Sequence, residues 1–518
     1  MKMSRACDIY IGLLLLSFPV VLILLFFTNV FSAHAITLSL KPMGEPRSLQ
    51  GPILGASTTA FYERLLEDPI KIAVLKKMSI GLDRFPGGSD ANFYNWHSGL
   101  IEIQAHPDSS RYVQFWAKAA KNIARGKPNG ITFEQYESFS RQIGAQIILV
   151  PNLESSSVTD QAEWFKRLAS EGIVPRRIEL GNEFWVAMGN DPASLARWPD
   201  ESTSMRIMKQ YLDAVKPYLP ANAKVAVQAA AGALDVQRGK FGQRLRQWDE
   251  DLRPEPWFDA VTLHLYPRLR EVMGDPDAGI TPPTPGNAMA RLKAMMARVD
   301  GGVERIFQNI ERRLPGKEIW ITEWNTRGAN PVIQRGNAVE PMSQAMEMLT
   351  TARMVLVQLR HPSITASLFF MYSFRLRDPH AMFVPDGRGS YSPVPTASAL
   401  QWLSEAANSG GSFQRLVQEG DHPVAGGGAK NESYFPVEGG RFESLEHTTI
   451  IVENVSSTTF SFDPTMLIKE RHPSRIETLA MSDLVNLEKT AAKIETQDPE
   501  KPIVVPPFSL IRIIWNKR

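Results

Sequence analysis

The sequence predicts a (β/α)₈ barrel, or TIM barrel, followed by an all-β sandwich module. Short apolar runs alternate with amphipathic stretches over most of the chain, which is typical of parallel strands covered by helices on both faces. From about residue 409 the chain instead shows segments rich in β-branched and aromatic residues. The length of 518 residues exceeds one ordinary domain and suits a large barrel with a smaller module.

Residues 1–35 have the organisation of a secretory signal. Lys2 and Arg5 precede an apolar run over residues 11–27, and Ala33-His34-Ala35 offers the small residues of a cleavage site. The alternative is an uncleaved membrane anchor, because the length of this run lies between a signal core and a spanning helix. Either interpretation predicts a secreted or periplasmic protein. The only cysteine, Cys7, lies in this leader, so disulfides are not expected in the mature chain.

Eight apolar runs are expected to form the barrel, over residues 53–408. Most of them are bounded by Gly, Pro, Asn or charged residues. In chain order they cover residues 52–56, 81–85, 145–151, 177–180, 223–229, 260–266, 318–323 and 367–372. Helices are predicted between them, most clearly at 70–78, 161–170, 204–218, 303–313 and 343–360.

Residues 409–518 are expected to form the β-sandwich module. A predicted helix over 396–407 ends in Asn408-Ser409-Gly410-Gly411, and no sustained helical period follows. The clearest strand predictions cover 448–455, 458–462 and 509–515. Residues 36–52 are expected to add an N-terminal strand to this module.

Two of the predicted barrel strands end in a glutamate. The fourth strand runs into Glu183, and the seventh ends at Glu323. Reactive groups in barrel enzymes project from the C-terminal ends of the strands, so we expect these carboxyl groups to meet. Two carboxyl groups about 5 to 5.5 Å apart can cleave a glycosidic bond through a covalent intermediate. We predict Glu183 as acid/base and Glu323 as nucleophile; the alternative is that both are solvated strand-end residues.

Four polar residues near these strand ends are predicted to support the pair. Asn182 is positioned to bond the sugar hydroxyl beside the reacting carbon. Arg84, which ends the second strand, is expected to keep Glu323 ionised, unless it forms only a structural ion pair. The Tyr266 hydroxyl would orient Glu323, whereas His264 is either part of the site or a hydrogen-bonded barrel histidine.

These motifs resemble the retaining (β/α)₈ glycoside hydrolases, and most of all the α-L-arabinofuranosidases. The segment Arg84-Phe85-Pro86-Gly87-Gly88-Ser89 with Tyr94-Asn95-Trp96 is similar to their R-Y-P-G-G-N and Y-N-W motifs. Leu180-Gly181-Asn182-Glu183 and Glu323-Trp324-Asn325 are similar to their L-G-N-E and E-W-N. Pro506-Pro507-Phe508-Ser509-Leu510 also resembles the end of their β-rich module. The resemblance implies hydrolysis of an oligo- or polysaccharide by double displacement through a covalent glycosyl-enzyme.

The chain also departs from the arabinofuranosidase pattern. Phe184-Trp185 follows Glu183, Asp83 precedes Arg84, and Ser89 stands where those enzymes have Asn. Heparanase-like β-glucuronidases are the near alternative, because they and β-xylosidase-like enzymes share the barrel, both glutamates and a β module. The sugar, the linkage and endo or exo action therefore stay open. A non-catalytic carbohydrate-binding protein of the cell envelope is the alternative from another functional class.

Four aromatic residues beside the predicted strand ends are candidates for stacking on sugar rings. They are Trp96, Trp185, Trp324 and Tyr372. Core packing is the alternative for all four, and it has equal weight for Trp324 and Tyr372.

Other chemistries have little support in the sequence. The formal net charge of +2, without a long basic run, gives no electrostatic footprint for nucleic acid. The nine histidines show no metal-ligand spacing, and phosphate-binding and G-x-S-x-G motifs are absent. We therefore expect a carbohydrate partner and neither a metal nor another cofactor, while the oligomeric state stays open.

Overall fold

The computed structural model describes residues 36–517 except 59, 127–128, 231–238, 327–340, 377, 379, 467 and 469–471. The predicted leader, residues 1–35, lies outside these described residues. Within them, no helix combines the length and the apolar character that a membrane span requires.

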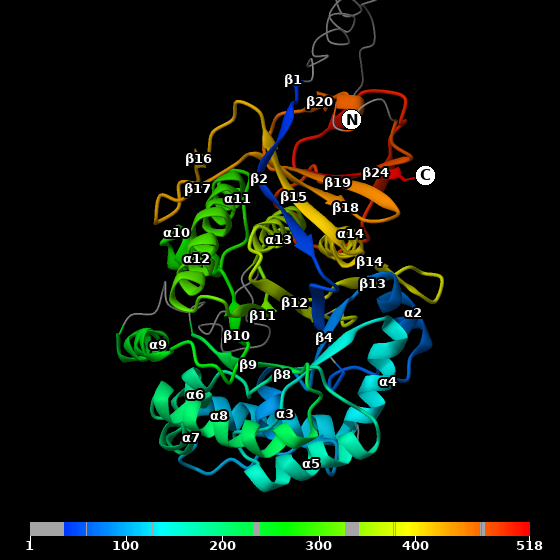
Figure 1. The fold of residues 1–518 in the computed structure, drawn as a ribbon. Helices are drawn as coiled ribbons and strands as arrows, with labels where there is room; N and C mark the ends of the chain where they lie inside the picture. Colours follow the sequence, from blue (N-terminus) through cyan, green and yellow to red (C-terminus); the bar gives the residue numbers. More distant parts are fainter. Residues whose placement is uncertain are drawn as a thin grey trace, which may run out of the picture.

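Parallel strands form a closed barrel in the lower half of the molecule as drawn in Figure 1. Each strand pairs with the next one along the chain, and the last pairs with the first. Within the described residues, the eight strands are β3 (Leu54–Thr58), β4 (Leu82–Phe85), β7 (Gln146–Leu149), β8 (Arg177–Glu179), β9 (Lys224–Gln228), β10 (Ala260–Leu265), β11 (Glu318–Trp324) and β12 (Ile364–Tyr372). The predicted (β/α)₈ fold is confirmed.

Helices surround the barrel strands (Figure 1). Those that the sequence predicted are α2 (Pro69–Lys77), α5 (Val158–Ser170), α8 (Glu201–Val215), α12 (Glu304–Arg313), α13 (Gln344–Leu359) and α14 (Pro395–Asn408). The structure adds four long helices that the sequence analysis did not predict: α3 (Arg111–Gly126), α4 (Phe133–Ile143), α9 (Gly239–Asp251) and α11 (Ala288–Ala297). The bounds of α4 do have a local cause, because Thr132 and Gln135 form a capping box and Gly144 ends the helix with a φ of 83°.

Among the described residues, two sheets form the sandwich of the β module at the top of Figure 1, beside a separate two-stranded sheet of β16 (Val424–Ala425) and β17 (Ser433–Tyr434). The larger is antiparallel, in the order β2 (Leu40–Leu49), β15 (Gly411–Gln418), β18 (Val437–Glu443), β19 (His447–Asn454), β24 (Ser509–Asn516), β21 (Arg475–Ala480) and β22 (Ile494–Thr496). The smaller contains β1 (Ile36–Thr37), β20 (Phe460–Phe462) and β23 (Ile503–Val505). Apolar side chains of both sheets, such as Ile450, Phe460, Val505 and Ile511, share one core. The predicted sandwich is confirmed, and β1 and β2, which precede the barrel in sequence, pair with its strands.

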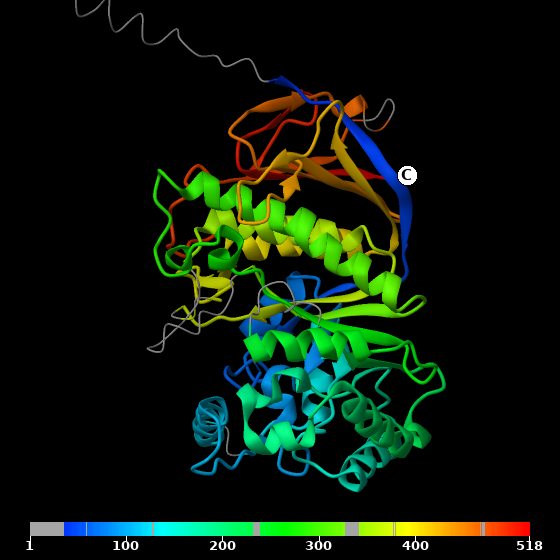
Figure 2. The same ribbon diagram turned by 90° about the vertical axis from the view of Figure 1, so that its left-hand side faces the viewer.

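The helices α13 and α14 lie between the barrel and the β module (Figure 2). Every residue of α13 is buried, on all sides of the helix. A helix of this kind packs against neighbours all round instead of presenting a polar face to water. The module is therefore built onto the barrel through a shared interior.

The barrel interior changes character along its axis. An apolar cluster that includes Leu82, Ile148 and Trp320 fills one level. Alternate residues on a strand face the same side, so Arg84 follows Leu82 into the interior, towards the C-terminal ends of the strands. The polar side chains at this second level bond one another and form the candidate site.

Candidate active site

Arg84 at the end of β4 connects three strand ends of the barrel. Its Nε and Nη2 donate to the two carboxylate oxygens of Glu179 at 2.7 and 2.9 Å. Nη1 donates to Glu323 Oε1 at 2.6 Å, and Nη2 also donates to Asn182 Oδ1 at 2.9 Å. Burial lowers the pKa of Arg84, but Glu179 and Glu323 more than offset this and raise it above its ordinary value. The guanidinium is therefore a fixed positive charge, and it makes the predicted contact with Glu323.

Glu323 reaches the same interior as its neighbour Thr322 because the strand is irregular. The pairing of β11 shifts register against both β10 and β12 near this point. Such bulges redirect side chains next to active sites. Glu323 Oε1 thus accepts from Arg84, and its Oε2 accepts the hydroxyl of Tyr266 at 2.7 Å. Tyr266 holds the angle of this carboxylate, as the sequence analysis predicted.

Glu183 sits just beyond β8 in a left-handed backbone conformation, with a φ of 52°. This region is costly for a side chain with a Cβ and is concentrated at functional sites. Gln228 supports the segment, because its Nε2 donates to the carbonyl of Leu180 at 2.9 Å and its Oε1 accepts from the amide of Phe184 at 2.8 Å. The Glu183 side chain is 21% exposed, whereas that of Glu323 is 8% exposed. The fold therefore holds Glu183 at the opening of the site.

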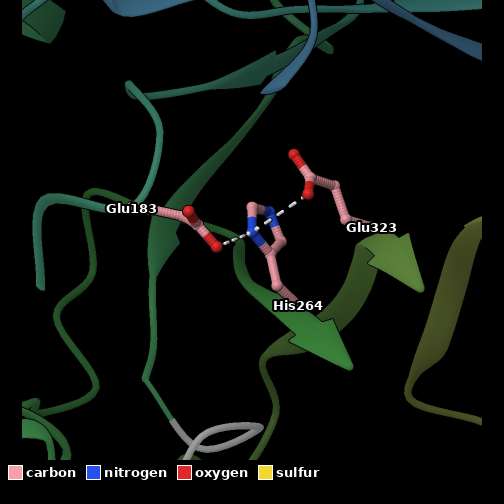
Figure 3. A group of neighbouring side chains, drawn as sticks. All are labelled: Glu183, His264 and Glu323. Atoms are coloured by element: carbon pink, nitrogen blue, oxygen red, sulfur yellow. Dashed lines mark hydrogen bonds and ion pairs between the residues drawn. The ribbon is translucent and has the colours of Figure 1, made fainter. Parts of the chain in front are cut away.

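His264 lies between the two glutamates (Figure 3). Its Nδ1 is 2.7 Å from Glu183 Oε1 and 3.7 Å from Glu323 Oε2. Its Nε2 lies 3.2 Å from the Thr322 hydroxyl, which itself donates to Glu179 Oε1 at 3.0 Å. Because that hydroxyl already donates to Glu179, both ring nitrogens of His264 are placed to act as donors.

The electrostatics of His264 agree with this bonding. Burial lowers the pKa of the imidazole, but the charges of Glu323 and Glu183 outweigh burial and raise that pKa to about 10. Burial raises the pKa of the Glu179 carboxyl group, but Arg84 and His264 outweigh burial and bring that pKa below its ordinary value. The site therefore holds a charged histidine and a permanently ionised Glu179 at neutral pH.

One carboxylate oxygen of Glu183, one of Glu323 and a ring nitrogen of His264 all lie within 4.8 Å of one another. The two predicted acids therefore meet at one site, from strands far apart in the sequence. These three groups have the atoms to ligate a cation. Arg84 weighs against that role, because its charge lies only 2.6 Å from Glu323 Oε1 and competes with a metal for that carboxylate.

Three of the four predicted stacking residues, Trp324, Tyr372 and Trp96, are part of the packed interior. Trp324 is 1% exposed and donates from Nε1 to the Ser367 hydroxyl at 2.8 Å. Tyr372, also 1% exposed, packs against Phe369 and Phe383. The sequence prediction for these two is corrected here, because no ring face is left for a sugar.

The other two aromatic candidates differ from each other. Trp96 is 9% exposed, stacks on His97 at a centroid distance of 3.7 Å and donates to Asp160, so its ring is also occupied. Trp185 is 8% exposed and lies two residues beyond Glu183. Trp185 therefore remains the aromatic candidate beside Glu183, at the opening of the site.

Sequence analysis missed two members of the site, Glu179 and Thr322. Both belong to barrel strands and are fully buried. A signal was present for Glu179, since a charged residue inside an apolar strand needs a buried partner. Thr322 gave no such signal, because threonine is common in strands.

Solved structures of glycoside hydrolases share this architecture. The GH51 arabinofuranosidase from Xanthomonas axonopodis pv. citri matches with a TM-score of 0.61 and 14% sequence identity, over 93% of this chain and 100% of that one. A family 51 alpha-L-arabinofuranosidase from Bifidobacterium longum matches with a TM-score of 0.62 and 12% identity, over 91% of this chain and 97% of that one. A GH44 xyloglucanase from Paenibacillus polymyxa matches with a TM-score of 0.55 and 11% identity, over 93% and 100%.

The chain has the fold of these glycoside hydrolases. The resemblance to arabinofuranosidases that the motifs suggested is thus confirmed for the fold. Neither a protein-family model nor a curated protein matches the chain. At 11 to 14% identity the likeness concerns architecture, and the activity has to be argued from the site.

Proposed function

We propose that this protein is an exported retaining glycoside hydrolase, with Glu323 as nucleophile and Glu183 as acid/base. The observation that carries the proposal is the approach of one oxygen from each carboxyl group to within 4.8 Å. Retaining glycosidases place their carboxyl groups about 5 to 5.5 Å apart, whereas inverting enzymes leave about 6.5 to 9.5 Å for a water molecule. The short separation supports double displacement.

In the first step Glu323 attacks the anomeric carbon while Glu183 gives a proton to the leaving oxygen. Arg84 and Tyr266 suit Glu323 to this role, because a guanidinium and a hydroxyl hold one carboxylate oxygen each. Asn182 is oriented by Arg84 through its Oδ1, which leaves its Nδ2 to donate to a sugar hydroxyl.

The proton for the leaving group comes from the Glu183–His264 pair. His264 Nδ1 faces Glu183 Oε1 at 2.7 Å, so a proton lies between these two groups at the opening of the site. As negative charge develops on the leaving oxygen, the proton passes from Glu183, while His264 keeps the resulting carboxylate bonded. In the second step Glu183 takes a proton from water, which then attacks the glycosyl-enzyme.

Replacing the two glutamates separately tests the proposal on a panel of aryl arabinofuranosides, xylosides, glucosides and glucuronides. Glu323→Ala is expected to abolish hydrolysis. Glu183→Gln is expected to lower kcat by about 10²- to 10⁴-fold, most for leaving groups of high pKa, because general-acid help matters most there. Proton NMR of the first product should show retained configuration.

Glu163→Gln on the surface of α5 serves as the control and should leave both activity and the thermal melt unchanged. A wild-type protein that hydrolyses nothing in the panel would instead support the non-catalytic carbohydrate-binding alternative. Export is part of the proposal and depends on residues 1–35. Expression with and without this leader, followed by fractionation, tests it and separates cleavage from anchoring.

A further inference from the structure

The segment that follows β4 runs alongside the proposed nucleophile. It forms the short helix η1 (Gly88–Phe93), whose residues other than Gly88 are buried. A Cβ atom added to Gly88 would lie 3.7 Å from Glu323 Oε1, so this backbone is in contact distance of the reacting carboxylate. η1 is therefore a wall of the pocket on the Glu323 side.

Asp90 of η1 is a buried acid that the proposed mechanism does not use. It is 5% exposed, and its Oδ1 accepts the hydroxyl of Tyr62 at 3.0 Å. Within the described residues this is the one hydrogen bond of the Asp90 side chain. Burial raises the pKa of Asp90, the Tyr62 bond lowers it and the Glu323 charge raises it again, to about 7. A carboxyl group in electrostatic range of Glu323 thus has acceptor capacity to spare.

The same wall extends to the side of Glu183. The hydroxyls of Ser89 and Tyr112 lie 2.7 Å apart, and Tyr112 belongs to the first turn of α3. Burial raises the pKa of Tyr112, and the charges of Glu183 and then Glu323 raise it further, so its hydroxyl lies within range of both acids. Ser89, Asp90 and Tyr112 therefore border the space in which a reacting sugar would sit.

A purely structural role would leave Asp90 as a link between two loops. That role accounts for the Tyr62 bond but gives no use to the second carboxylate oxygen, which has no partner among the described residues and is not closed off from solvent. Hydroxyl groups of a bound sugar are donors and would fill it. A hydrogen bond to a charged acceptor is also among the stronger contacts a sugar can make.

The charges around the pocket favour a neutral sugar. Within the part of the chain that the structure describes, Glu179, Glu183, Glu323 and Asp90 supply four carboxyl groups, and Arg84 and His264 are bonded to three of them. Arg375, an exposed cation, acts electrostatically on Tyr62. A uronate carboxylate would meet like charge here, and like charges close together are strongly unfavourable.

We propose that Asp90 is a specificity-determining ligand that accepts hydrogen bonds from the hydroxyls of a neutral sugar in the reacting position. This inference rests on the proposed glycosidase function and narrows its substrate class. It separates the two substrate types left open by the motifs, neutral glycosides and glucuronides, in favour of the first.

The test compares wild type with Asp90→Asn, which keeps the shape and an acceptor for Tyr62 but removes the charge. The probes are the 4-nitrophenyl glycosides of α-L-arabinofuranose, β-D-xylose, β-D-glucose and β-D-glucuronic acid, with monodeoxy analogues of the neutral sugar hydrolysed fastest. Wild type should prefer a neutral glycoside. Asp90→Asn should lower kcat/KM on it by roughly 10- to 100-fold, the size expected for a bond to a charged group. That loss should vanish on the one deoxy analogue that lacks the bonded hydroxyl.

Two further variants separate recognition from structure. Tyr62→Phe should show a smaller loss with the same deoxy pattern, because Tyr62 positions Asp90 without touching substrate. Asp160→Asn, in the first turn of α5 where Asp160 binds His97, is the matched control and should keep wild-type discrimination.

The outcomes distinguish this inference from the function on which it rests. An active wild type that prefers the glucuronide overturns the inference alone. So does an Asp90→Asn variant whose loss is equal on every deoxy analogue, since that is the signature of a structural defect. Absence of hydrolysis on the whole panel rejects the glycosidase itself, and the inference with it.

Discussion

Arg84 and Arg353 are both fully buried, and each is paired with more than one carboxylate, yet they serve different parts of the molecule. Arg84 joins Glu179 and Glu323 at the strand ends of the barrel. Arg353 of α13 joins Asp300 of the π-helical turn η6 (Arg298–Val303) and Glu453 of β19. The first cluster lies at the proposed catalytic centre, and the second lies where barrel and β module meet.

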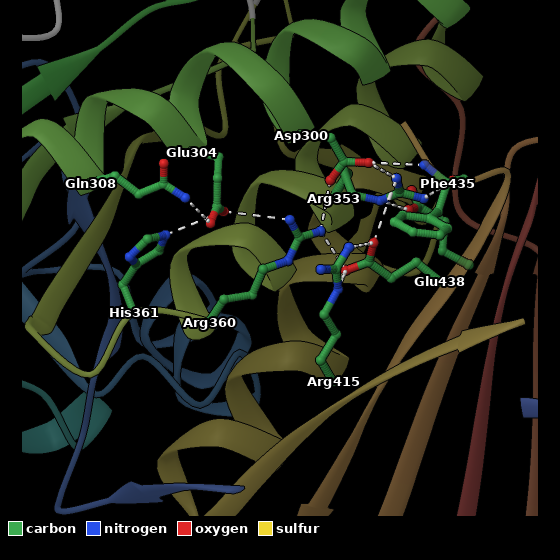
Figure 4. Close-up of polar contacts among 10 residues, drawn as sticks. Asp300, Glu304, Gln308, Arg353, Arg360, His361, Arg415, Phe435 and Glu438 are labelled. Atoms are coloured by element: carbon green, nitrogen blue, oxygen red, sulfur yellow. Dashed lines mark hydrogen bonds and ion pairs between the residues drawn. The ribbon is translucent and has the colours of Figure 1, made fainter. Parts of the chain in front are cut away.

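The second cluster connects the barrel helices to the strands of the module (Figure 4). Arg360 donates to Asp300 and to Glu438 of β18, and Arg415 of β15 binds Glu438 at 2.9 and 3.1 Å. Arg353 also donates to the carbonyl of Phe435 at 3.0 Å. Charged groups on the barrel side thus form ion pairs with charged groups on strands of the module. These ion pairs fix the orientation of the module relative to the barrel.

The first cluster is open on one side. Glu183 keeps a partly exposed carboxyl group and a left-handed backbone, and Glu323 lies beside a wall with spare acceptor capacity. The same chemistry therefore serves two purposes. In the cluster around Arg353, ion pairs between the barrel and the β module hold the two together. In the cluster around Arg84, one side faces the pocket, and the charges there set the protonation of the groups that would act on a substrate.

The largest expected effect distinguishes these two purposes directly. Arg84→Met and Arg353→Met each remove a buried cation from a group of carboxylates, which should cost about 3–5 kcal/mol of unfolding free energy in both variants. Only Arg84→Met should also lower kcat per folded molecule, by about 10²- to 10³-fold, the size expected when a preorganised charge is removed from an active site. Denaturant unfolding and kinetics on folded fractions measure both quantities. Equal kinetic losses in the two variants would contradict the division of roles.

An intermediate effect is expected from His264, whose pKa is raised to about 10 in the folded state. Its protonated form stabilises the folded protein fully below about pH 6.5, and this contribution is lost as pH rises through about 10. His264→Gln should remove this pH dependence, which amounts to at most about 1.4 kcal/mol for each pH unit in that window. Thermal melts of variant and wild type from pH 6 to 10 measure the difference. The exposed His447→Gln is the control, and parallel curves for all three proteins would refute the assignment.

The smallest expected effect concerns the aromatic residues. Trp324→Phe removes the Nε1 bond to Ser367 and leaves a small gap, so stability should fall by about 1–2 kcal/mol. KM should stay within about twofold of wild type, because the buried ring has no sugar to stack on. Trp185→Phe provides the comparison beside Glu183. A large rise in KM for Trp324→Phe would restore the stacking role that its burial argues against.

Much of the architecture could be predicted because its signals are local. Each of the eight barrel strands falls on a predicted apolar run, since parallel strands covered on both faces must be apolar. Glu183, Glu323, Arg84 and Tyr266 could be found because they interrupt or end such runs. The helices α3 and α4 were missed, although α4 has a capping box that could have been noticed.

The sequence by itself determined the fold class, the order of the strands and which acids end them, because periodicity and strand-end position depend on neighbours in the chain. Only the tertiary structure decided which charged groups pair with one another. Closing the barrel brings Glu179 to Arg84 and His264 to Glu183, and it buries Trp324 and Tyr372 instead of exposing them. The physical reason is that protonation and burial depend on neighbours in space, and the strands that supply those neighbours are far apart in sequence.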